Sequence, residues 1–305
     1  MSTAAVRQEI EGAPCAPVPR TNILGVGISV INMDDALRYS DALICSDERS
    51  YICITDVHTV VEAQGDPEFR AILNNSFMTT PDGMPLVWVG KTQGHERIRR
   101  VYGPDYLMEM CRVSVRRGYR HFFFGGKPGV AERLAVSLLE QFPGLEVTGV
   151  YTPPFRALNP AEEDELEALV ARAKPDVFWV GLGSPKQERF MAKYCGRFDA
   201  KLMVGVGAAF DIHSGAVKEA PKWMKSAGLQ WLHRLAQEPR RLWKRYLICI
   251  PSFLGMISLQ LLGIRRFNFD SDLTGRGSSS KRASIRSGQH RVEEMQTPHE
   301  QHQEL

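Results

Sequence analysis

One acidic residue stands between two apolar segments in a setting that suits a catalytic base. Asp82 follows the apolar run Phe77–Thr80 and lies between Pro81 and Gly83. We expect a tight turn in which Pro81 fixes one backbone angle and Gly83 relieves another, so that the carboxylate is held rigidly. Such a carboxylate can take the proton of an attacking hydroxyl. The same pattern also fits an ordinary turn or helix-capping aspartate, and spacing alone leaves both interpretations open.

Two further loops follow expected strands, where ligands bind in open α/β sheets. Thr55 ends an apolar run and His58 follows three residues later. Their side chains can touch a phosphate or sugar, or simply cap a helix. Gly125 and Gly126 open a glycine-rich turn before a helix, where backbone N–H groups can approach a diphosphate. A simple tight turn explains these glycines equally well.

A fourth loop places two polar residues in the first turn of an expected helix. Gln187 and Glu188 follow Gly181 and Gly183, so the backbone can come close to a ligand there. Their side chains can reach a base or sugar, although Glu188 also complements the helix dipole. None of the glycine turns matches the Walker loop or the dinucleotide fingerprint. A nicotinamide dehydrogenase is therefore a weak interpretation of this chain.

The elements that must position these loops alternate along the chain. Short apolar runs are followed by helical patterns, which predicts an α/β fold: a Rossmann-like parallel sheet with helices on both faces. We expect strands over Ile23–Ile31, Tyr51–Thr55, Phe77–Thr80, Arg120–Phe124, Glu146–Tyr151, Val177–Gly181 and Lys201–Val206. We expect helices over Val57–Gln64, Tyr106–Arg117, Val130–Gln141, Pro160–Ala173 and Ser184–Tyr194.

The predicted organisation has four parts. Residues 1–20 are polar and proline-containing and should be disordered, and residues 21–217 form the catalytic α/β domain. Residues 218–267 form a basic and apolar helical appendage, in which Pro239 begins a new helix. Residues 268–305 are rich in Ser, Gln, His and charge and should be a disordered tail.

The segment 218–267 concentrates positive charge. It holds ten Lys or Arg residues against two Glu, whereas the whole chain has a net charge of +3. A basic, Trp-containing segment that runs into an apolar one suggests contact with anionic lipid headgroups or a phosphorylated ligand. Arg241 and Arg245 are four residues apart and therefore share a helix face. A solvated basic face is the alternative, and both can hold together.

Residues 247–264 contain no charged side chain, and basic residues stand at both ends. As a helix this stretch would be about 27 Å long, slightly short of the roughly 30 Å hydrocarbon core. We expect an interfacial or re-entrant helix, with a membrane span and a soluble packing or oligomer helix as alternatives. Six scattered cysteines and a polar N-terminus predict free thiols and a cytoplasmic catalytic part.

Six collinear motifs resemble the bacterial WecG/TagA/CpsF glycosyltransferases (glycosyltransferase family 26), in particular the exopolysaccharide-type members. The resemblance covers roughly residues 21–266. The motifs are TDVHTVVEA (55–63), TTPDGMPLVW (79–88), FFFGGKPGVAERLA (122–135), VGLGSPKQERFM (180–191), VGVGAAFDIHSG (204–215) and APKWMKSAGLQWLHRLAQEPRRLWKRY (220–246).

The resemblance implies an inverting, metal-independent sugar transfer without a cofactor. The donor would be a UDP-sugar, of N-acetylmannosaminyl or glucosyl type, and the acceptor a polyprenyl-diphosphate-linked saccharide in the biosynthesis of cell-surface polysaccharide. The enzyme would be a peripheral protein at the cytoplasmic face of the bacterial inner membrane, with no nucleic-acid partner. Its oligomeric state stays open, with a homo-oligomer as one alternative. The D-x-D at Asp270-Ser271-Asp272 lies in the polar tail and is not expected to bind metal.

The resemblance also implies roles for particular residues. Asp82 would be the base, with Thr55 beside it. Where the family often has Asn two residues after this Thr, the chain has Val57. Either His58 takes over a contact with the acceptor or donor, or it is a structural histidine that faces the helix. The implied donor-binding residues are Gly125, Gly126, Gln187, Glu188 and Asp211. The implied residues for the acceptor and its diphosphate are Arg234, Arg241, Arg245 and His58.

One alternative of a different class stays open at this point. A non-catalytic nucleotide-sugar-binding or scaffold protein of a polysaccharide assembly complex would need the same glycine turns. The Pro81-Asp82-Gly83 segment and the Arg241/Arg245 pair favour the enzyme.

Overall fold

A six-stranded parallel sheet forms the centre of the protein. The computed structural model describes residues 17–226 and 228–269. The strand order is β4-β3-β8-β7-β5-β6, and every neighbouring pair is parallel. The strands are β3 (Ser50–Thr55), β4 (Met78–Pro81), β5 (Arg120–Gly125), β6 (Glu146–Tyr151), β7 (Val177–Gly181) and β8 (Leu202–Gly205). The α/β class and the parallel sheet predicted from the sequence are confirmed.

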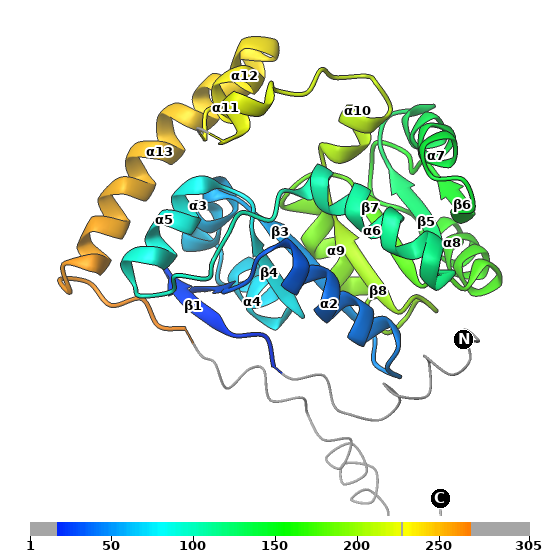
Figure 1. Ribbon diagram of the computed structural model, residues 1–305, viewed down its shortest axis with the longest axis horizontal. Coiled ribbons are helices and arrows are strands. Elements are labelled where there is room, and N and C mark those ends of the chain that lie inside the picture. The colour runs from blue at the N-terminus through cyan, green and yellow to red at the C-terminus, as the bar shows by residue number, and fades with distance from the viewer. Residues whose placement is uncertain (1–16, 227, 270–305) are drawn as a thin grey trace, which may run out of the picture. The chain divides into compact units, whose positions relative to one another are not determined.

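Helices cover both faces of this sheet (Figure 1). The first face carries α3 (Val57–Gly65), α4 (Pro67–Asn75), α5 (Met84–Thr92), α8 (Pro160–Ala173) and α9 (Lys186–Tyr194). The second carries α2 (Met33–Ile44), α6 (Gly103–Arg117), α7 (Val130–Gln141) and α10 (Ala209–His213). Side chains of β7 alternate between the faces, with Phe178 in the first core and Trp179 in the second.

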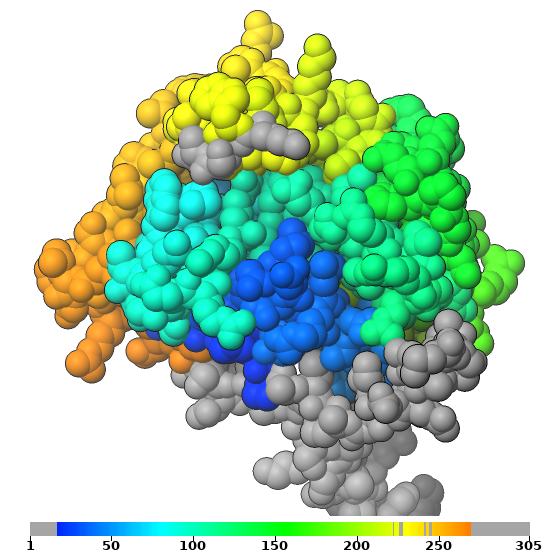
Figure 2. Space-filling model, viewed as in Figure 1, coloured from blue at the N-terminus to red at the C-terminus, as the bar shows by residue number. Residues whose placement is uncertain are grey.

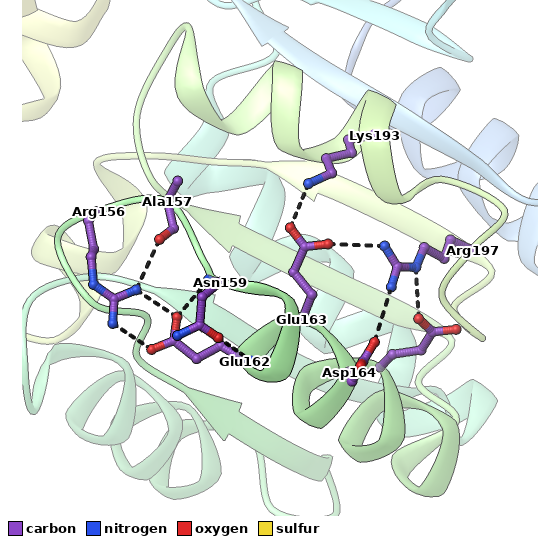
Figure 3. A network of polar contacts seen from close by, with 9 residues as sticks. Arg156, Ala157, Asn159, Glu162, Glu163, Asp164, Lys193 and Arg197 are labelled. Carbon is purple, nitrogen blue, oxygen red and sulfur yellow. Dashed lines mark hydrogen bonds and ion pairs between the residues drawn. The ribbon is translucent and has the colours of Figure 1, made fainter.

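Polar contacts at the surface join two helices of the first face (Figure 3). Glu163 in α8 accepts hydrogen bonds from Lys193 in α9 at 2.6 Å and from Arg197, just beyond α9, at 3.1 Å. Asn159 caps α8 by accepting from the N–H of Glu162. Arg156 contacts the same Glu162 through both of its Nη atoms at 2.7 Å. The network therefore fixes the start of α8 and its position beside α9.

The N-terminal strand prediction is wrong in one respect. Ile23–Ile31 is not one strand of the central sheet but part of a hairpin, in which β1 (Arg20–Ile23) pairs antiparallel with β2 (Val26–Ser29). Leu24 and Gly25 both have positive φ, at 53° and 79°, which reverses the chain. The other predicted strands and helices are present with ends shifted by at most three residues.

Three helices follow the α/β part of the chain and are called the C-terminal helices below. They are α11 (Lys222–Ser226), α12 (Gln230–Gln237) and α13 (Pro239–Leu261). The predicted helix start at Pro239 is confirmed. Figure 2 shows the segment of α11 and α12 lying over α5 and α6, and Figure 1 shows α13 running down beside α3.

The docking of α13 uses one side of the helix. Phe253 and Ile257, one turn apart, are buried in the first core. Gln260 accepts from the N–H of Leu24 at 2.7 Å and donates to the carbonyl of Asn22 at 2.8 Å. Within the described residues, no helix is long and apolar enough to cross a membrane. The uncharged stretch 247–264 lies mostly within this docked helix.

Candidate active site

The four loops singled out in the sequence lie at one edge of the sheet, because the strands they follow are parallel. The order in which the chain adds strands reverses between β5 and β7. Helix α7 connects β5 to β6 on one side, whereas α9 connects β7 to β8 on the other side, and the two helices cover opposite faces of the sheet. Ligands in open α/β sheets bind at such a point, beyond the carboxyl ends of the strands. This edge is therefore the candidate active site.

Asp82 stands directly after the end strand of the sheet. Thr55 and Pro81 are register partners in β3 and β4, and the N–H of Asp82 donates to the carbonyl of Thr55 at 2.9 Å. The expected tight turn is wrong: Pro81 ends the strand, and Gly83 caps α5 with an extended backbone at φ −90°. Asp82 is thus held by strand pairing and not by a turn.

Arg100 reaches Asp82 from the loop that precedes α6. The N–H of Val101 donates to the carbonyl of Pro81 at 2.9 Å, which lays this loop along the end of β4. Nη2 of Arg100 donates to Oδ1 of Asp82 at 3.2 Å, and Nε donates to its backbone carbonyl. The guanidinium also lies 4.4 Å from the ring centroid of Tyr102. Arg100 is therefore oriented by a carboxylate and an aromatic ring together.

The surroundings of Asp82 tune its acidity toward the range that a general base needs. Burial raises its pKa to about 6, against the opposing effect of Arg100. The nearby Asp56 raises this pKa further, and Arg234 of α12 lowers it. Its side chain is still 21% exposed, so a substrate hydroxyl can reach it. At neutral pH the group is mostly ionised yet basic enough to accept a proton.

The other two predicted residues of the β3 loop differ in their placement. Thr55 is fully buried, and its hydroxyl donates to the carbonyl of Cys53 at 3.2 Å, so it adjoins Asp82 through the backbone. His58 lies in the first turn of α3, with Nε2 3.8 Å from Oε2 of Glu62 on the next turn. His58 therefore lies near the predicted loop, and its side chain approaches Glu62 of the same helix.

Close packing explains part of the glycine turns. A Cβ on Gly125, whose φ is +126°, would lie 2.7 Å from the backbone of Gly181. The N–H of Gly126 donates to the carbonyl of Gly181 at 3.0 Å. Gly183 differs: its φ is +75°, and a Cβ there would meet nothing within 4 Å. Gly125 and Gly126 thus bring two strand ends together, whereas Gly183 faces open space.

Gln187 and Glu188 supply buried acceptors at this edge. Nε2 of Gln187 donates to Oε1 of Glu188 at 3.0 Å, and both residues are buried. Oε1 of Gln187 and Oε2 of Glu188 find no hydrogen-bond partner within the described part of the chain. Burial raises the pKa of Glu188 to about 7. An unpaired buried acceptor is costly, which is a reason to expect a ligand donor there.

Asp211 and Arg234 come together although they are far apart in the sequence. Asp211 in α10 and Arg234 in α12 line one pocket, together with Glu219, Gln230 and His233. The structure therefore joins a predicted donor-binding residue to a predicted acceptor-binding residue. Arg241 and Arg245 lie in α13, but their side chains are outside the described ones.

No cluster of three or more His, Cys, Asp or Glu suited to a metal ion occurs in residues 17–226 and 228–269. The D-x-D sequence that begins at residue 270 lies outside the described residues.

Sequence reasoning missed three residues of the site: Asp56, Arg100 and Gln230. Asp56 caps α3 and raises the pKa of both Asp82 and Glu188. Its position at a strand end was a usable signal. Arg100 and Gln230 approach from loops and helices that no local pattern connects to Asp82.

A parallel α/β sheet whose candidate ligand-binding edge carries an ionisable carboxylate beside an arginine has features expected of an enzyme that activates a hydroxyl. Comparison with known proteins defines the class further. The model of the glycosyl transferase WecG/TagA/CpsF family matches residues 21–267. The chain therefore belongs to this family, and it is a glycosyltransferase.

Two curated relatives carry the same printed name, N-acetylglucosaminyldiphosphoundecaprenol N-acetyl-beta-D-mannosaminyltransferase. The one from Bacillus subtilis is 31% identical over 189 residues, which are 62% of this chain and 71% of the relative. The one from Bacillus spizizenii is 32% identical over 196 residues, which are 64% of this chain and 74% of the relative.

Proposed function

We propose that the protein transfers N-acetylmannosamine from its UDP-sugar to an undecaprenyl-diphosphate-linked N-acetylglucosamine, in the synthesis of a cell-surface polysaccharide. Membership of the family and the names of the two relatives support the donor and the acceptor. The observation that carries the proposal is the Asp82 carboxylate, buried enough to raise its pKa to about 6 and paired with Arg100.

In the proposed reaction the acceptor hydroxyl attacks the anomeric carbon in line with the departing UDP. A bond forms between the hydroxyl oxygen and that carbon, and the bond from the carbon to the β-phosphate oxygen breaks. Asp82 accepts the hydroxyl proton, and UDP takes the electron pair of the broken bond. The configuration at the anomeric carbon is inverted because attack and departure occur on opposite faces.

The donor is proposed to lie along the glycine turns and the buried acceptors. Gly183 leaves space for close approach to the backbone. The unpaired oxygens of Gln187 and Glu188 accept from the N–H or hydroxyl groups of the sugar nucleotide. We propose that Arg234, whose charge lowers the pKa of Asp82, stabilises the charge that develops on the diphosphate.

The acceptor is a lipid, so we further propose that the C-terminal helices rest on the cytoplasmic face of the membrane. Large apolar side chains of α13 and the residues after it stay exposed on the side that does not dock: Leu247, Ile248, Leu254, Leu261, Leu262 and Ile264. Arg265 and Arg266 follow them and are also exposed. Apolar side chains beside cations suit the interface of an anionic bilayer.

A donor panel tests the proposed function. The enzyme is incubated with a polyprenyl-diphosphate N-acetylglucosamine and one of three donors: UDP-N-acetylmannosamine, UDP-N-acetylglucosamine or UDP-glucose. The mass of each product is determined by mass spectrometry. We expect one added N-acetylhexosamine from the first donor alone. UDP binding by calorimetry with no product from any donor would contradict the proposal and favour a nucleotide-sugar-binding or scaffold protein.

A further inference from the structure

Gln230, in the first turn of α12, contacts the partner of the catalytic carboxylate. Its Oε1 accepts from Nη2 of Arg100, the same nitrogen that donates to Asp82. Its Nε2 donates to the hydroxyl of Tyr102, whose ring lies under the Arg100 guanidinium. Gln230 is only 8% exposed, so these bonds form away from bulk water. One side chain of the C-terminal helices thus fixes two groups beside Asp82.

Neighbouring residues hold this end of α12 against the α/β part of the chain. Gly228 has φ +72°, and a Cβ there would lie 3.2 Å from the side chain of Met84 in α5. Lys225 in α11 forms ion pairs with Asp105 at 3.1 Å and with Glu219 at 2.8 Å. Gln230 is therefore presented to Arg100 only while this segment is docked.

The charged and titratable groups around Asp82 come from several elements. Asp56 at the start of α3 raises its pKa, whereas Arg100 and Arg234 lower it. Burial raises the pKa of the Tyr102 phenol most strongly, and the charge of the nearby Asp82 raises it further. Arg100 is the one of these groups that is hydrogen-bonded to the Asp82 carboxylate, so its orientation has the largest bearing on the ionised form.

We propose that Gln230 is a positioning residue, which holds the Arg100 guanidinium on the Asp82 carboxylate and so makes docking of the C-terminal helices a condition for an effective base. This inference rests on the proposed role of Asp82. In this proposal α12 orients a partner of the catalytic base, a role that differs from binding a diphosphate or a lipid. With α12 undocked, Arg100 loses an acceptor and is free to turn away.

The pH dependence of kcat/KM in the full-length Gln230→Ala variant tests the proposal. We expect kcat at pH 7 to fall about tenfold, because a carboxylate that Arg100 no longer holds is less well oriented toward the acceptor hydroxyl. The KM for the UDP-sugar should change little. The acid limb of the profile, where kcat/KM falls as Asp82 becomes protonated, should move to higher pH by roughly half a unit. The reason is that a displaced Arg100 stabilises the ionised Asp82 less. Tyr102→Phe, which keeps the ring, should shift the limb in the same direction by less.

A double-mutant cycle with Arg100→Ala separates positioning from a general structural role. If Gln230 acts through Arg100, adding Gln230→Ala to Arg100→Ala should change neither kcat nor the acid limb further. Gln260→Ala is the matched control, since this glutamine also bridges the C-terminal helices to the rest of the chain, but at the β1–β2 turn. It should leave the acid limb in place.

Additive effects of the two substitutions, or an equal shift of the acid limb in Gln260→Ala, would overturn the proposal. An unchanged kcat and acid limb in both Gln230→Ala and Tyr102→Phe would overturn it as well. Asp82→Asn distinguishes these failures from failure of the proposed function. If Asp82→Asn still transfers sugar, the base assignment itself is wrong, whatever Gln230 does.

Discussion

The two halves of the candidate ligand-binding edge differ in the chemical groups that form them. Around β3 and β4 the site consists of charged side chains: Arg100 donates to Asp82 and to Gln230 of α12, and the charges of Asp56 and Arg234 act on Asp82. Around β5 and β7 it consists of glycine backbone and buried side-chain acceptors: Gly125 and Gly181 touch, Gly183 faces open space, and Gln187 and Glu188 leave two acceptor atoms unpaired.

This difference suggests a division of work. The charged half already has its internal partners, so its groups are poised for proton transfer before a substrate arrives. The glycine half is incomplete in its hydrogen bonding, which is expected of a surface that a ligand completes. Ser184 and Thr59 connect the halves, with their hydroxyl oxygens 3.4 Å apart.

The largest effect is expected from the charged half. Asp82→Asn keeps the size of the side chain but removes the proton acceptor. Transfer should fall by about 10² to 10⁴-fold, the usual contribution of a general base. The melting temperature should not fall, because an amide here carries no charge to be buried. Rapid transfer by this variant, measured as product formed from UDP-N-acetylmannosamine, would remove the distinction between the halves.

A backbone substitution should have the next largest effect, on folding. Gly125→Ala places a Cβ 2.7 Å from the backbone of Gly181 at a φ of +126°. We expect the free energy of unfolding to fall by about 3 kcal/mol or more. Gly196→Ala is the control, because its φ is +81° but nothing lies within 4 Å. It should cost only about 1 kcal/mol in urea denaturation.

The buried carboxyl of the glycine half should make stability depend on pH. The pKa of Glu188 is about 7 in the folded protein and near 4.3 in an unfolded chain. Folding therefore keeps a proton that the unfolded chain releases, so stability falls between about pH 4.3 and 7 and stays level above.

Glu188→Gln should remove up to about 4 kcal/mol of this pH-dependent loss. The exposed Glu140→Gln in α7 is the matched control and should leave the slope as in the wild type. Parallel unfolding curves for wild type and Glu188→Gln across this pH range would show that the carboxyl is hydrated, contrary to its burial.

The smallest effect concerns the open glycine. Gly183→Ala meets no protein atom within 4 Å, so its stability should match that of Gly196→Ala. Binding of UDP, measured by calorimetry, should nevertheless weaken about tenfold, because the new methyl group occupies the space of the donor. Unchanged UDP affinity would place the donor elsewhere on this edge.

The sequence predicted the sheet well where the signal was local. The β7 strand and the α8 helix have the predicted ends, because an apolar run in one case and Pro160 after a capping Asn159 in the other mark them. The hairpin at Leu24 was missed, since a positive φ at leucine has no sequence signature. Helices α2, α4 and α5 were not predicted either.

The site was predicted in part for a similar reason. Asp82, Gln187 and Glu188 follow strands, so topology alone brings them to one edge. Arg100 reaches Asp82 because Val101 pairs with the end of β4, and Gln230 because α12 docks there. Both contacts depend on tertiary packing between segments that are distant in the sequence, so no local residue spacing predicts them.

The pH dependence of kcat/KM for UDP-N-acetylmannosamine tests most directly whether Asp82 is the base. Because the ionised carboxylate is the active form, kcat/KM should be level near neutral pH and fall tenfold per unit below about pH 6, where Asp82 becomes protonated. The residual activity of Asp82→Asn should lack this limb. A wild-type profile without a limb near pH 6, or the same limb in Asp82→Asn, would contradict the account.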